Sequence, residues 1–88
     1  MTLRLRDGVY LAETEYGIAL LDEGSGEYWN LNPTGAEVLR RLLDGETQAQ
    51  AAEGLIKEYD VDMESASQDV LELIGELESA KLIVQVDG

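Results

Sequence analysis

The chain contains no cysteine and no histidine among its 88 residues. Without cysteine there is no disulfide, no thiolate ligand and no cysteine nucleophile, and without histidine the commonest general base is also missing. Carboxylates are plentiful, but in a chain with 19 acidic residues, pairs such as Glu72 with Glu76 arise by chance. We therefore expect no enzyme activity, no metal ion and no cofactor.

Basic residues are also scarce: the chain has six of them and 19 acidic residues, which gives a net charge of −13. Such a field repels the phosphate backbone of nucleic acid and attracts basic peptides or basic protein faces. The alternative interpretation is that the charge serves only to keep the protein soluble.

Long apolar runs are absent. Residues 1–8 include Arg4 and Arg6 but no apolar core of a signal peptide, and no segment approaches the roughly 18 apolar residues of a membrane span. We expect one cytoplasmic domain over residues 1–88, without a membrane partner.

Short apolar runs separated by glycine-containing turns fill the first third of the chain. They predict strands at 9–13, 18–21 and 27–31, paired in sequential order, which leaves 27–31 at an edge. Residues 3–5 alternate in polarity but have no assignable partner. Residues 83–86 either add a strand or fray.

Helix-start signals mark the remaining two thirds. Asn32 as N-cap and Pro33 at the first helical position predict a helix over 33–43, and Thr47 to Gln50 form a capping box for a second helix. A third helix over 63–80 follows, capped by Asp62 or Ser65. The predicted fold is α+β and winged helix-turn-helix-like, with a three-stranded antiparallel sheet followed by three helices.

The aromatic edge strand and the third helix are the predicted binding site. An edge strand offers unpaired backbone groups to an extended peptide, and the apolar arc of the third helix is wider than core packing needs. Carboxylates on that helix, including Asp69, are placed to pair with basic peptide residues. The predicted binding residues are Glu27, Tyr28, Trp29, Asn30, Leu31, Asp69, Val70, Leu73, Ile74 and Leu77.

Two questions about this site stay open at this point. Tyr28 and Trp29 are adjacent in a strand and point to opposite faces, so one of them faces the peptide and the other the core. Leu31, Leu73 and Leu77 are equally well explained as core residues.

DNA binding is the common use of a helix-turn-helix, but it requires basic residues on the recognition helix. The third helix carries five carboxylates and no lysine or arginine before Lys81. The sequence therefore disfavours this function.

Several short motifs match one family in the right order. They are Leu20-Leu21-Asp22, Gly26 to Ala36 (Gly-Glu-Tyr-Trp-Asn-Leu-Asn-Pro-Thr-Gly-Ala), Leu43 to Thr47 (Leu-Asp-Gly-Glu-Thr), Tyr59-Asp60-Val61, Asp69-Val70 and Leu77 to Ile83 (Leu-Glu-Ser-Ala-Lys-Leu-Ile). In these motifs the chain resembles the small domains similar to pyrroloquinoline quinone biosynthesis protein D, also called recognition elements of ribosomally synthesised and post-translationally modified peptides (RiPPs). The resemblance is greatest to the stand-alone version of lasso peptide biosynthesis.

This resemblance implies a function that composition alone does not indicate. Such domains bind the leader of a precursor peptide as a strand beside 27–31, in a groove closed by the third helix. A separate leader peptidase and a cyclase then act on the peptide. The alternatives are an acidic adaptor in another RiPP pathway, and, for assembly, a monomer or a strand-swapped dimer.

Overall fold

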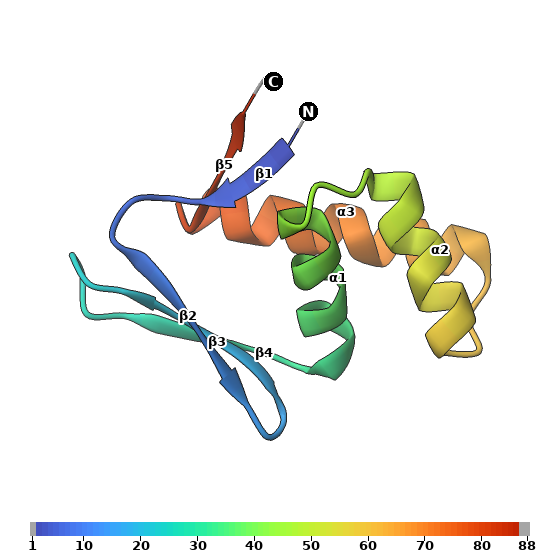
Figure 1. Ribbon diagram of the computed structural model, residues 1–88, viewed down its shortest axis with the longest axis horizontal. Coiled ribbons are helices and arrows are strands. Elements are labelled where there is room, and N and C mark those ends of the chain that lie inside the picture. The colour runs from blue at the N-terminus through green and yellow to red at the C-terminus, as the bar shows by residue number, and fades with distance from the viewer. Residues whose placement is uncertain (1, 87–88) are drawn as a thin grey trace.

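The computed structural model describes residues 2–86 and contains eight helices and strands. They are β1 (Thr2–Leu5), β2 (Val9–Thr14), β3 (Gly17–Asp22), β4 (Tyr28–Leu31), α1 (Pro33–Leu43), α2 (Gln48–Glu58), α3 (Met63–Ser79) and β5 (Ile83–Val86). Figure 1 shows α1 in the middle of the molecule, between a sheet of three strands and the pair formed by α2 and α3. The predicted α+β class, with a three-stranded antiparallel sheet before three helices, is confirmed.

The three-stranded sheet has the order β2-β3-β4, so β4 is at an edge as predicted. Leu20 is paired with Leu11 on one side and with Trp29 on the other, and directly paired residues of antiparallel strands share a face. This face turns toward the helices, and Ile18 and Leu20 on it are buried. Glu27, predicted as the first residue of the edge strand, lies just outside β4.

The two ends of the chain form a second, two-stranded sheet in which β1 and β5 are antiparallel. Leu3 of β1 and Ile83 of β5 are buried in the core, so this sheet closes one side of it. The pairing assigns a partner to residues 3–5 and makes 83–86 a strand. Sequence patterns do not reveal it, because the paired residues lie at opposite ends of the chain.

Helix α1 begins where the capping residues predict. The side chain of Asn32 accepts a hydrogen bond from the Gly35 N–H at 2.8 Å, and Pro33 occupies the first turn. After the C-cap residue Asp44, Gly45 has a φ of +95°, a conformation that glycine adopts without a steric penalty. The predicted helix bounds of 33–43 are confirmed.

The other two helices also start at side-chain caps. Both reciprocal bonds of the predicted capping box join Thr47 and Gln50 at the start of α2. The Asp62 carboxylate accepts a bond from the Ser65 N–H at 2.8 Å, and this bond lowers the pKa of Asp62. Asp62, rather than Ser65, is therefore the cap of α3.

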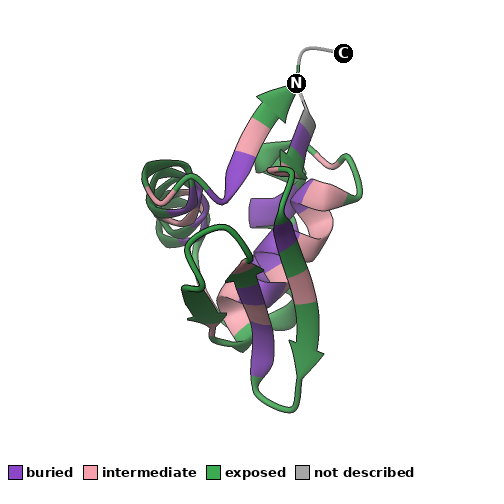
Figure 2. Cartoon of the chain, turned by 90° about the vertical axis from the view of Figure 1, so that its left-hand side faces the viewer, coloured by how far each residue is buried: buried purple, intermediate pink, exposed green. Residues whose placement is uncertain are grey.

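The core lies where α1 meets the sheets and the two other helices. Its buried members on α1 are Ala36, Val38, Leu39 and Leu42, and on α3 they are Ala66, Val70, Ile74 and Leu77. Figure 2 looks nearly along α3, with its buried side toward the molecule and an exposed side outward. Within residues 2–86, no helix combines the length and the apolar character of a membrane span.

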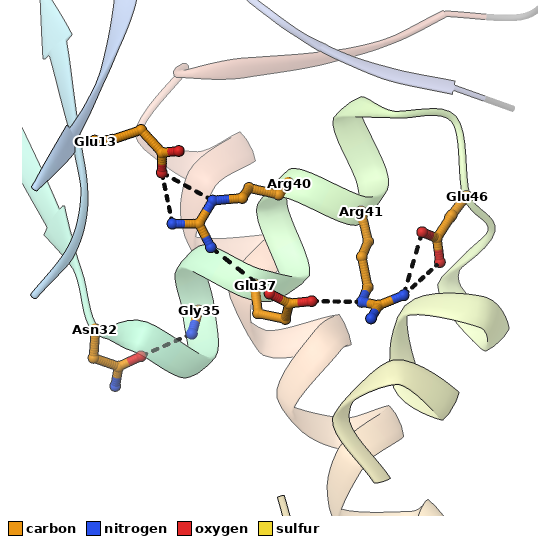
Figure 3. A network of polar contacts seen from close by, with 7 residues as sticks. All are labelled: Glu13, Asn32, Gly35, Glu37, Arg40, Arg41 and Glu46. Carbon is orange, nitrogen blue, oxygen red and sulfur yellow. Dashed lines mark hydrogen bonds and ion pairs between the residues drawn. The ribbon is translucent and has the colours of Figure 1, made fainter. Parts of the chain in front are cut away.

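A polar network ties α1 to its neighbours (Figure 3). Arg40 contacts Glu13 of β2 at 2.6 Å, and this hydrogen-bonded carboxylate raises the pKa of Arg40. Arg41 contacts Glu37 at 2.9 Å and Glu46 of the α1–α2 loop at 3.4 Å. All of these side chains are partly exposed, so the network contributes little to stability.

The two-stranded sheet gives a direct test of the fold. Replacement of the buried Ile83 by alanine leaves a cavity and is expected to lower the free energy of unfolding by about 2–4 kcal/mol. Val86→Ala, on the same strand at 37% exposure, should change it by less than about 1 kcal/mol. Urea unfolding followed by circular dichroism measures both, and equal losses would contradict the described packing of β5.

Candidate functional site

Strand β4 presents one open edge. Asp22 N–H donates to the Glu27 carbonyl at 2.9 Å, and hydrogen-bonded pairs alternate along an antiparallel ladder. The alternation directs the backbone groups of Trp29 and Leu31 toward β3, and those of Tyr28 and Asn30 away from it. No other strand within residues 2–86 pairs with this edge, so Tyr28 and Asn30 are ready to pair with an added strand.

A hollow of about 690 Å³ lies beside this edge, between β4 and α3. The strand contributes Trp29, whose side chain is 37% exposed, and the helix contributes Glu72, Gly75, Glu76, Ser79 and Ala80. Apart from the two carboxylates, the walls are an indole ring and small side chains. The hollow therefore suits a large apolar side chain that enters from a strand paired with β4.

A second hollow of about 290 Å³ continues the first toward the start of α1. It is lined by Asn32, Thr34, Gly35, Val38, Asp69, Glu72, Leu73 and Glu76. Because Glu72 and Glu76 line both hollows, the two are neighbours along α3, and together we call them the β4–α3 groove.

The groove is acidic along α3, most of all in the second hollow, where Asp69 joins Glu72 and Glu76. Asp69, Glu72 and Glu76 lie along α3, and the ion pairs found within residues 2–86 do not involve them. Glu72 accepts a bond from the neutral Gln68 amide at 3.3 Å. The negative potential along this helix favours peptides with basic residues over acidic ones.

The structure shows which face of the sheet each aromatic residue of β4 occupies. Trp29 lies on the inner face and lines the groove, whereas Tyr28 points to the opposite face and is 66% exposed. There Tyr28 continues a row with Leu21 and Tyr10, its neighbours across β3 and β2, and both are exposed. A strand added to β4 would thus have Trp29 beside one set of its side chains and Tyr28 beside the other.

Three of the predicted groove residues are core residues instead. Val70, Ile74 and Leu77 are each at most 4% exposed, so their side chains support α3 from beneath and offer no free surface to a peptide. Leu73 and Asp69 do line the groove. Leu31 is half-buried beneath the edge of the sheet, and Glu27 and Asn30 are exposed.

Several groove residues escape the sequence reasoning. Gly75, Ser79 and Ala80 have small side chains that draw no attention in the sequence, and Thr34, Gly35 and Val38 fall within the predicted first helix without being predicted as site residues. A signal was present for Gly75, because glycine is unfavourable inside a helix and its presence there calls for a reason.

Arg6 links the β3–β4 hairpin to the end of α3, next to the larger hollow. Its guanidinium contacts the Asp22 carboxylate at 2.7 Å, beside the β3–β4 turn, and donates from Nε to the Lys81 carbonyl just after α3. Asp22 is only 15% exposed in its side chain and also accepts from Gly24 N–H at 3.0 Å. Arg6 is therefore placed to hold the strand hairpin at a set distance from the end of α3.

The family model described as Coenzyme PQQ synthesis protein D (PqqD) matches residues 17–83. The match starts with the first residue of β3 and ends with the first residue of β5, so it contains both walls of the β4–α3 groove. The chain therefore belongs to the PqqD family.

Two solved structures of similar proteins, both complexes with a leader peptide, match the chain over nearly its full length. One, described as "Lasso peptide synthetase B1 complexed with the leader peptide", is 40% identical, covers 97% of this chain and 100% of that chain, and superposes with a TM-score of 0.91. A second, "TbiB1 in Complex with the TbiA(beta) Leader Peptide", is 22% identical over 100% of both chains, with a TM-score of 0.84, and shows the shared fold. A comparison with curated proteins finds no match.

The role of Arg6 is testable without any ligand, because Trp29 is the only tryptophan of the chain and lines the groove. Arg6→Met leaves a mostly buried Asp22 without its cation, and we expect a loss of about 1 kcal/mol in unfolding free energy. Release of the hairpin should also increase quenching of Trp29 fluorescence by acrylamide. In the control Arg40→Met, which breaks the exposed pair with Glu13, the quenching should equal that of the wild type. Equal quenching in both variants would contradict the connection.

Proposed function

We propose that the chain binds the leader region of a ribosomally synthesised precursor peptide and serves lasso peptide maturation. The observation that carries this proposal is the open edge of β4 beside a groove large enough for a peptide side chain. The comparison with solved structures also supports it, because the 40% identical lasso peptide synthetase B1 was solved as a complex with a leader peptide.

In the proposed complex the leader adds to the sheet as a fourth strand. The backbone groups of Tyr28 and Asn30 pair with it, which requires little of the leader sequence. Side chains on one face of the leader enter the groove between Trp29, Leu73 and the exposed side of α3. Basic leader residues are favoured near Asp69, while Glu27 and Leu31 flank the two ends of the paired segment.

The proposed role is recognition and delivery, without chemistry on the peptide. The chain lacks both histidine and cysteine, so the usual nucleophiles and bases for cutting or closing a peptide are missing. A leader peptidase and a cyclase are accordingly the proposed partners that act on the delivered precursor.

We also propose that the fold is related to winged helix-turn-helix domains. Helices α2 and α3 are joined by the short turn 59–62 and pack together, as in a helix-turn-helix, and a small sheet accompanies them. The acidic exposed side of α3 argues against a shared function, because shared folds carry unrelated sites.

A binding titration tests the function. Fluorescein-labelled leader peptides, one from the lasso peptide synthetase B1 complex and one from any precursor found to be encoded beside the gene of this protein, are expected to give saturable polarisation changes. An interface of this type should reach a Kd below about 1 μM, or roughly −8 kcal/mol. Unlabelled duplex DNA should not compete. The absence of saturation with both leaders would refute the proposal.

A proline substitution tests whether the open edge pairs with the leader. Asn30→Pro removes an N–H that points away from β3, so the ladder of the sheet keeps its bonds while the edge loses a donor. We expect affinity for the leader to fall at least about tenfold, given roughly 1.5 kcal/mol per lost bond plus the steric effect of the ring.

Two controls accompany this variant. Asn30→Ala keeps the backbone donor and should lose less affinity than Asn30→Pro. Glu13→Pro places the same ring on β2, the outer strand at the opposite side of the sheet, and should bind like the wild type. Circular dichroism confirms that each variant is folded. Equal affinity of folded Asn30→Pro and wild type would exclude strand addition at β4.

A further inference from the structure

Gly75 lies in the interior of α3, a helix of 17 residues. Glycine in a helix interior destabilises the folded state, because the unfolded chain has more backbone freedom to lose than it has with alanine. A helix that keeps glycine at such a position usually does so for close packing or for a ligand.

Packing within the chain does not explain this glycine. Gly8, Gly17, Gly26 and Gly45 have positive φ angles, and a Cβ at Gly54 would collide with the Arg41 side chain. At Gly75 the φ angle is ordinary for a helix, and apart from the chain neighbours and the backbone of its own helix an added Cβ would meet no atom within 4 Å. Of the glycines within residues 2–86, Gly75 is the one with neither a special backbone conformation nor a close neighbour.

The position of Gly75 supplies a different explanation. It lines the 690 Å³ hollow on the helix side, while the indole of Trp29 lines it on the strand side. Glu72 and Ser79, one turn before and one turn after, flank it on the same helix face and also line the hollow. Because Gly75 has no side chain, the hollow is wider at this point of α3, opposite the Trp29 ring.

We propose that Gly75 determines which leaders fit the groove. In this proposal, which rests on leader binding as the function, a large apolar leader side chain lies between the Trp29 ring and the bare backbone of α3. A side chain at position 75 would occupy that space in the complex, although it meets nothing in the free protein. The helix thus retains a destabilising residue for the sake of the ligand.

The proposal predicts opposite effects on stability and on binding. Gly75→Ala should raise the melting temperature of the free protein by roughly 3–6 °C, because alanine favours the helix and the space is open. The same variant should bind the labelled leader about tenfold more weakly, and Gly75→Leu about a hundredfold more weakly, because the added carbons overfill the complex. A substitution that merely disturbed the fold would lower both quantities.

The matched control is Leu71→Ala, one turn away on α3, exposed and outside the β4–α3 groove, where it lines a separate hollow with Gln48 and Ala49. It should leave leader affinity within about twofold of the wild type, a difference of roughly 0.4 kcal/mol. An alanine scan of the leader adds a second readout. One large apolar leader residue should lose its contribution in Gly75→Leu, so that its alanine variant binds the wild type and Gly75→Leu with similar affinity.

The outcomes separate this inference from the proposed function. If the wild type binds the leader and Gly75→Ala binds equally well or better, the role of Gly75 is refuted and leader binding stands. A lower melting temperature for Gly75→Ala would also refute it, since the glycine would then serve the fold. If the wild type binds no leader, both the function and the inference fall.

Discussion

The passage from β4 into α1 through the single residue Asn32 is the constraint on which the rest of the site depends. Asn32 ends the strand and caps the helix, and Pro33 starts the helix with a backbone angle already suited to it. Since α1 is packed against β1, β3 and α3, this short connection leaves β4 little freedom to turn. The open edge is therefore held beside α3, with the larger hollow between Trp29 and the helix.

The groove exists because two surfaces that meet at α1 diverge from it. Near Asn32 the start of α1 and Leu73 of α3 line the same hollow, and farther along Arg6 spans from Asp22 to the end of α3. Side chains pointing inward from β4 have no neighbouring strand to cover them on one side, so Trp29 remains partly exposed. An edge strand thus gains its ligand surface from the same open side that leaves its backbone unpaired.

Local signals predicted much of this fold. Caps at Asn32, Thr47 and Asp62 define the helix starts, because each depends on hydrogen bonds within three residues. The pairing of β1 with β5 left no such signal, since it joins the two ends of the chain. On α3, hydrophobic periodicity could not tell the core stripe from its neighbour, so Val70, Ile74 and Leu77 were assigned to the groove although they are buried.

The sequence by itself determined the order of the elements, the edge position of the aromatic strand and the acidic, histidine-free surface, because composition and short-range hydrogen bonds decide these properties. Only the tertiary structure decided which side of β4 faces the helices, and hence that Trp29 lines the groove while Tyr28 lies on the outer face. It also decided that Gly75 stands opposite Trp29. Both placements depend on contacts between elements far apart in the sequence, and α1 packs against β3, β4 and α3.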